Sequence, residues 1–217
     1  MTHHDEEECV GKRWVKVAGG VALALVAACA KEQPKPAAMT PPPGPAKGTP
    51  EWKIENAMSA APAAIASAAT IMDFPGPDGK MPQLRAGTNG WTCVPDDPGT
   101  PVNDPTCSDA GFMGWFGAWM QHKAPHLTAP AVAYMLQGSA DASNTDPFKT
   151  KPDSGQSWVI TGPHIMIAVP DARSLSKLST DSKSGGPYVM FAGTPYAHLM
   201  IPVAAAKADS GSGGMTM

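Results

Sequence analysis

The segments WVITGPHIMIAVP (residues 158–170) and YVMFAGTPYAHLMIPV (residues 188–203) decide the fold class. Both are rich in β-branched and aromatic residues and are interrupted by Gly and Pro, a pattern typical of short strands separated by turns. Gly193-Thr194-Pro195 separates the last two strands so tightly that we expect an antiparallel hairpin. The second half of the chain is therefore predicted to be rich in antiparallel strands.

Outside these segments, further elements are predicted from capping residues and apolar runs. Thr49-Pro50-Glu51 has an N-cap residue, a proline at the first helical position and an acid in the first turn, which predicts a helix up to about Ala61, before Pro62. A second helix is expected from Ser108 to about Lys123, because Phe112, Trp115, Phe116 and Trp119 form an apolar stripe at helical spacing. The expected strands cover residues 69–72, 83–93, 131–136, 158–161, 164–169, 188–191 and 196–203, with a short helix over 171–179.

Together these elements predict an α+β fold, with one or two helices in the N-terminal half and an antiparallel β-rich C-terminal half. Residues 51–203 are long enough for a single globular domain with a sizeable core. Residues 204–217 are of low complexity and are expected to be disordered. The net charge of −3 and the lack of charge runs argue against a nucleic-acid surface.

One five-residue pattern occurs twice in the strand-rich half. Pro163-His164-Ile165-Met166-Ile167 is similar to Ala197-His198-Leu199-Met200-Ile201. Residues two apart on a strand share a face, so each His is expected to point the same way as its Met. If the two strands are neighbours, two imidazoles and two thioethers converge, and this ligand set suits copper, particularly Cu(I). The pattern predicts a metal site formed by His164, Met166, His198 and Met200.

Other interpretations of the same residues stay open. Met is ordinary filling for an irregular core, and a half-buried His can be satisfied by a backbone carbonyl. A hydrolase-like enzyme using His164 or His198 is a further alternative, with Asp109, Asp141 or Asp146 as candidate orienting carboxylates. No nucleophile stands at a diagnostic spacing, and the sequence has no Rossmann, P-loop, zincin or nucleophile-elbow motif. An enzyme is therefore the less favoured class, and no catalytic residue is assigned.

Two other groups of polar residues have ordinary explanations. Residues 141–146 are oxygen-rich and resemble a calcium loop in outline, but they lack the Gly and the distant Glu of an EF-hand and also fit a simple turn. His122 and His126, at the end of the second predicted helix, are expected to be capping or exposed residues rather than ligands.

Two of the four cysteines are expected to form a disulfide. Cys9 and Cys29 lie in the N-terminal region, which has the features of an export signal, so Cys93 and Cys107 are the two that remain for the folded domain. The Pro-rich loop between them cannot fold regularly by itself, and two cysteines in an oxidising compartment pair readily. A disulfide between Cys93 and Cys107 would close this loop covalently and stabilise the fold by about 3 kcal/mol.

The N-terminal region has the features of an export signal. Lys12, Arg13 and Lys16 precede an apolar run from Val17 to Ala28, which is shorter than the ~20 residues needed to span a bilayer. The run ends in Val26-Ala27-Ala28-Cys29, which resembles the lipobox of bacterial lipoproteins. Because residues 5–8 are acidic, which an export signal should not be, we expect the true translation start near residue 10, which would exclude Cys9.

The lipobox resemblance implies a processing route and a location. Residues 1–28 would be a signal peptide removed before Cys29, whose thiol would carry the lipid that anchors the chain to the bilayer. Residues 29–50 would form a Pro-rich, extended tether. Ala30, rather than Asp, follows the cysteine, which by the same resemblance favours the outer membrane facing the periplasm. The alternative is an ordinary secretory signal with a soluble product.

Two functional hypotheses follow from the whole sequence. The first is a membrane-anchored envelope lipoprotein whose domain binds a ligand or a metal, with copper as the candidate cofactor. The second is a structural or envelope-interaction lipoprotein without chemistry of its own. Convergence of the two His-x-Met strands would favour the first hypothesis.

Overall fold

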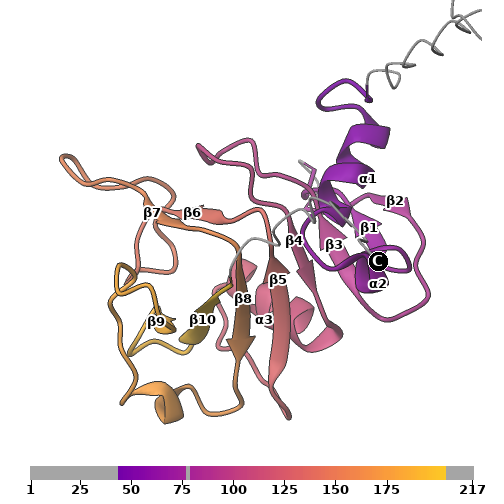
Figure 1. Ribbon diagram of the computed structural model, residues 1–217. Coiled ribbons are helices and arrows are strands. Elements are labelled where there is room, and N and C mark those ends of the chain that lie inside the picture. The colour runs from indigo at the N-terminus through magenta and orange to yellow at the C-terminus, as the bar shows by residue number, and fades with distance from the viewer. Residues whose placement is uncertain (1–43, 77–78, 204–217) are drawn as a thin grey trace, which may run out of the picture. The chain divides into compact units, whose positions relative to one another are not determined.

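The computed structural model describes residues 44–76 and 79–203, which form an α+β domain as predicted (Figure 1). Its helices are α1 (Pro50–Met58), α2 (Ala63–Ala66), α3 (Ala110–Met120) and the short 3-10 helix η1 (Ala172–Leu175). Its strands are β1 (Thr70–Met72), β2 (Gln83–Arg85), β3 (Thr92–Val94), β4 (Thr106–Ser108), β5 (Ala131–Met135), β6 (Ser139–Asp141), β7 (Val159–Thr161), β8 (His164–Ala168), β9 (Tyr188–Met190) and β10 (His198–Pro202).

Eight of these strands form one sheet in the order β2-β1-β3-β4-β5-β8-β10-β9. Neighbouring strands are antiparallel except for β1 and β3, which are parallel. Strands β6 and β7 pair separately as a two-stranded sheet. The predicted antiparallel layer and the hairpin between β9 and β10 are confirmed. The sheet also extends into the first half of the chain through four three-residue strands, of which β4 had not been predicted.

Both longer helices begin at side-chain N-caps, of which that at Thr49 was expected. The Thr49 hydroxyl accepts from the Trp52 N–H at 3.2 Å, and the Asp109 carboxylate accepts from the Phe112 N–H at 2.7 Å. The helices end earlier than predicted, at Met58 and Met120. At the end of α3, His122 has a left-handed backbone with φ of 55°. Its N–H donates to Trp119 while that of Lys123 donates to Ala118, a Schellman arrangement that terminates the helix.

The helices cover opposite faces of the sheet. Strand side chains alternate between the faces, so Tyr134 and Ala133 on β5 point in opposite directions. Tyr134 packs with Cys93, Cys107 and the residues of α1 and α2, which form one apolar cluster. Ala133 belongs to a second cluster, together with Phe112 and Trp115 of α3 and with buried residues of β8, β9 and β10. The face under α3 therefore carries the side chains that the sequence singled out.

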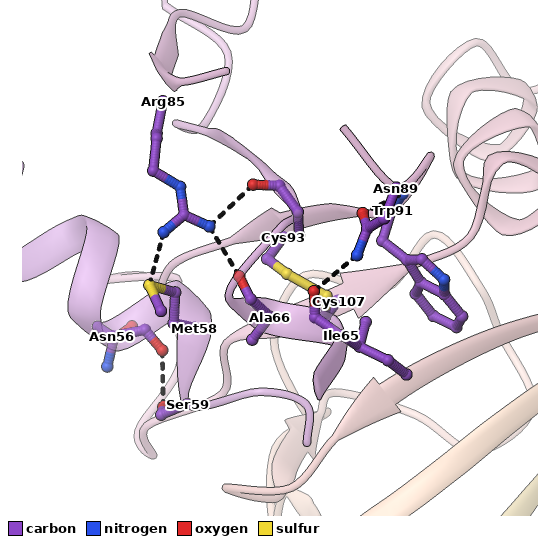
Figure 2. The surroundings of a disulfide bond; sticks show 11 residues. Asn56, Met58, Ser59, Ile65, Ala66, Arg85, Asn89, Trp91, Cys93 and Cys107 are labelled. Atoms are coloured by element: carbon purple, nitrogen blue, oxygen red, sulfur yellow. Dashed lines mark hydrogen bonds between the residues drawn. A yellow bond between two sulfur atoms is a disulfide. The ribbon is translucent and has the colours of Figure 1, made fainter. Parts of the chain in front are cut away.

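The disulfide between Cys93 and Cys107 is present, as predicted (Figure 2). The two cysteines are directly opposite each other on β3 and β4, with a Cα–Cα distance of 3.9 Å, and both are buried. Nearby, the Arg85 guanidinium donates to the carbonyl oxygens of Ala66 and Ala69 at 2.7 and 2.9 Å. These hydrogen bonds connect β2 to the end of α2 and to the residues that follow it, next to the disulfide-bonded strands β3 and β4.

The expected signal peptide, Cys9, the lipidated Cys29, most of the tether and the tail from residue 204 lie outside the described residues. Among the helices of residues 44–76 and 79–203, none has the length and apolar character needed to cross a membrane.

Candidate functional site

The two His-x-Met strands are direct neighbours in the sheet. Strands β8 and β10 pair antiparallel, with Met166 opposite Met200, His164 opposite Pro202 and His198 opposite Ala168. Residues directly opposite each other in a sheet point to the same face. His164, Met166, His198 and Met200 therefore share the face under α3, and all four are buried. The expectation that each His lies on one face with its Met agrees with this geometry.

Two further methionines lie on the same face, one beside each histidine. Met135 on β5 is directly opposite His164, and Met190 on β9 is directly opposite His198. Both methionines are buried. We call this set the histidine–methionine band, and it contains Met135, His164, Met166, Met200, His198 and Met190. Side chains directly across a strand pair have Cβ atoms about 5 Å apart, so each histidine is within reach of its facing methionine.

Each histidine of the band makes the same local contact. The Nδ1 atom of His164 lies 2.7 Å from the Gly162 carbonyl oxygen, and that of His198 lies 3.0 Å from the Tyr196 carbonyl oxygen. A carbonyl only accepts, so Nδ1 must carry the proton and Nε2 must carry a lone pair. Within the part of the chain that the structure describes, Nε2 is buried in both rings and has no hydrogen-bond partner. Two identical unsatisfied acceptors in one core call for an explanation, because buried polar atoms are nearly always paired.

Burial keeps both imidazoles neutral. His164 is 0% exposed and His198 is 2% exposed. Burial lowers the pKa of His164 and lowers that of His198 to about 4, and the nearby His164 contributes to the second shift. A neutral imidazole with a free Nε2 lone pair is the form that binds metal ions.

Aromatic rings enclose His198. The rings of Trp115 and Phe112 on α3 approach it edge-on, with centroid distances of 5.2 and 6.2 Å. Phe191, just after β9, approaches at 5.5 Å. These rings exclude water from this end of the band, which strengthens any electrostatic or ligand bond made there.

A polar cluster lies beside the middle of the band. Tyr188, directly opposite Met200, has its hydroxyl 2.7 Å from that of Thr161. Burial raises the pKa of the Tyr188 phenol. The nearby Asp141 carboxylate accepts from the Ser139 hydroxyl at 3.1 Å, and burial raises its pKa to about 6. Hydroxyl and carboxyl groups thus lie next to the histidine–methionine band.

The register places His164 and His198 at different points along the strand pair. His164 and His198 are at opposite ends of the β8–β10 pair, four strand positions apart. With a rise of ~3.3 Å per residue, that offset is about 13 Å along the strands. This offset is one of backbone position, and the prediction of one site shared by both rings stays a prediction. The Met166–Met200 pair lies between the rings, and each ring has a methionine of its own across the sheet.

The remaining sequence candidates have structural partners. The carboxylates of Asp109 and Asp146 accept from backbone N–H groups, at Phe112 and Val132 for the first and at Phe148 for the second. Neither orients an imidazole, since both Nδ1 atoms face carbonyl oxygens. In the part of the chain that the structure describes, neither ring is hydrogen-bonded to a hydroxyl or a thiol, which is the contact a hydrolase would use.

The other polar candidates have ordinary local roles. In the loop from Asp141 to Asp146, the Ser143 hydroxyl accepts from the N–H groups of Thr145 and Asp146, which makes a simple turn. His122 and His126 are exposed, as expected. Across residues 44–76 and 79–203, no three His, Cys, Asp or Glu side chains gather into a metal-binding group. The histidine–methionine band is not a group of this type, because four of its six members are methionines.

Met135 and Met190 were missed by sequence reasoning. Met135 is the last residue of β5 and alternates in step with Ala131 and Ala133, so the sequence indicates that these three side chains share one face of the strand. Its position opposite His164 depends on the pairing of β5 with β8 and on the register of that pair, which no local pattern specifies. Comparisons of the chain with protein-family models, with curated proteins and with solved structures found no match.

Proposed function

We propose that this chain is an envelope lipoprotein whose folded domain binds a soft monovalent metal ion, Cu(I), at the histidine–methionine band. The observation that carries the proposal is the unpartnered, buried Nε2 atom of both His164 and His198. Each stands among methionines on one face of the sheet. An unpaired imidazole nitrogen beside thioether sulfurs is a combination of donors that soft metal ions prefer.

The ligand types select the ion. Thioether sulfur and neutral imidazole favour Cu(I), whereas Ca²⁺ and Mg²⁺ require oxygen ligands, which the band lacks. All six members of the band are uncharged, so a bound ion keeps its full charge inside the core. The cost of burying charge rises steeply with its magnitude, which favours a monovalent over a divalent ion.

The hydrogen bonds of the histidines prepare them for metal binding. Metal-binding histidines commonly donate their other ring N–H to a carbonyl or carboxylate, which fixes the tautomer and the ring orientation. The bonds to Gly162 and Tyr196 supply this arrangement twice. An ordinary core histidine would be expected to use both of its nitrogens, and neither of these does.

Competition with a coloured Cu(I) chelator such as bicinchoninate tests the metal proposal, using the full chain under anaerobic reducing conditions. His164→Leu and His198→Leu should each weaken Cu(I) retention at least tenfold at the affected end, because each removes the nitrogen ligand. His126→Leu is the matched control, since His126 is exposed and outside the band. Retention equal to wild type in both band variants, or none in wild type, would contradict the proposal.

The envelope location rests on the sequence alone. The basic stretch, the apolar run and the lipobox-like Val26-Ala27-Ala28-Cys29 support cleavage before Cys29 and attachment of lipid there. Cys29→Ser should abolish metabolic labelling with a fatty acid and release the chain from the membrane fraction. Intact processing with unchanged membrane association would overturn this part of the proposal without affecting the metal-binding part.

A further inference from the structure

We infer that the histidine–methionine band binds two Cu(I) ions, one at each end, rather than one ion in its middle. This inference rests on the proposed function and specifies its stoichiometry. At the first end, His164 has Met135 directly opposite on β5 and Met166 two residues along on β8, on the same face. One nitrogen and two sulfur ligands are a sufficient set for Cu(I), which accepts low coordination numbers.

The second end repeats this arrangement. His198 has Met190 directly opposite on β9 and Met200 two residues along on β10. Because β8 and β10 run antiparallel with Met166 opposite Met200, the two ends are related by a local twofold axis through that methionine pair. Each end thus has its own imidazole, its own facing methionine and one member of the central pair.

A single central ion would leave part of the band without a role. The two histidines are four strand positions apart, and each has a facing methionine at its own end, which an ion at the central methionines would leave unused. Both Nε2 atoms are buried and unpaired in the described residues. Two ions satisfy both nitrogens. Two unit charges about 13 Å apart repel each other at an effective dielectric of ~20. This repulsion corresponds to about a tenfold difference in affinity, so the second ion should bind about tenfold more weakly than the first.

The two ends are chemically unequal, which allows them to be told apart. Among the described residues, aromatic rings surround His198, with Trp115 at 5.2 Å, whereas His164 has no such ring contact. An ion at the His198 end should therefore quench the fluorescence of Trp115, whereas an ion at the His164 end should leave it nearly unchanged. The Trp115→Phe variant identifies the share of the signal that comes from this residue among the six tryptophans of the chain.

Native mass spectrometry of the full chain loaded with Cu(I), or with Ag(I) as a redox-stable substitute, counts the ions. Wild type should retain two, and Met135→Leu and Met190→Leu should each retain one. Of these two variants, only Met190→Leu should lose the quenching of Trp115. Leu replaces Met with little change in volume, so both variants are expected to fold. Met113→Leu, a half-buried methionine of α3 outside the band, is the control and should retain two ions.

The outcomes separate this inference from the proposed function. One ion in wild type that is lost in either variant would overturn the two-site inference and leave Cu(I) binding intact. An unchanged count of two ions in both variants would also overturn it, because the facing methionines would then not be ligands. Retention of no ion by the folded wild type would overturn both.

Discussion

Met166 on β8 and Met200 on β10 lie directly opposite each other, at the centre of four paired strands. This pairing sets the place of every other member of the band. His164 and His198 follow two residues to either side of the methionine pair, and the neighbouring strands supply Met135 and Met190. Because side chains alternate along a strand, the two histidines share a face, and the register places them at opposite ends of the β8–β10 pair.

Substitution of the central pair separates a ligand role from core filling. In Met166→Leu with Met200→Leu, the free energy of unfolding without metal should change by less than about 1.5 kcal/mol per site, because the volumes are similar. Cu(I) affinity should nevertheless fall at both ends, which chelator competition measures. A large stability loss with unchanged affinity would show that the thioethers serve the core alone.

Asp141 should make stability depend on pH in a way that Asp141→Asn removes. Burial raises the pKa of this carboxyl to about 6 from the usual 3.8, so its ionisation above pH 6 destabilises the folded state. The penalty is full above about pH 6 and disappears as the pH falls towards 4. The Asn variant should therefore exceed wild type by about 3 kcal/mol at pH 8 and come close to it near pH 4. Urea unfolding at several pH values measures this difference, and a constant difference would contradict it.

The local patterns in the sequence predicted the fold class and most elements. The N-cap at Thr49 and the alternation of side chains around His164 and His198 depend only on nearby residues, and the structure agrees with each. The end of α3 was placed too late, because His122 adopts the left-handed conformation that usually marks a Gly.

The band itself could only be half predicted. Which residues share a strand face follows from the sequence, but which strands are neighbours, and in what register, is decided by the packing of the whole sheet. A shift of the β8–β10 register by two residues would bring His164 and His198 closer while keeping both on the same face. The offset between His164 and His198 along the strand pair was therefore not available from the pattern alone.

Reduction of the disulfide should weaken the fold. Cys93 and Cys107 are separated by 14 residues, and closing a loop of that size contributes about 3 kcal/mol. Denaturant unfolding of wild type with and without dithiothreitol should show this loss. The Cys93→Ala, Cys107→Ala double variant should give the same result in both conditions. An equal midpoint for oxidised and reduced wild type would contradict the expectation.

His122 offers a matched pair of substitutions at a helix end. Its ring stacks on Phe148 with centroids 4.1 Å apart, while its left-handed backbone costs about 1 kcal/mol relative to glycine. His122→Ala should destabilise by about 1 kcal/mol because it loses the stack and keeps the backbone cost. His122→Gly should lie near wild type, since the two changes offset each other. Thermal denaturation of the two variants measures the cost of the left-handed backbone at this position. An Ala variant at least as stable as the Gly variant would contradict the expected cost.

X-ray absorption at the copper edge of the Cu(I)-loaded full chain tests the central claim most directly, because it reports the atoms bound to the ion. The histidine–methionine band predicts a first coordination shell containing both sulfur and nitrogen. The sulfur contribution should fall in the Met135→Leu, Met190→Leu double variant and stay unchanged in Met113→Leu. A shell of nitrogen and oxygen alone, or a sulfur contribution that survives the loss of both facing methionines undiminished, would contradict the account.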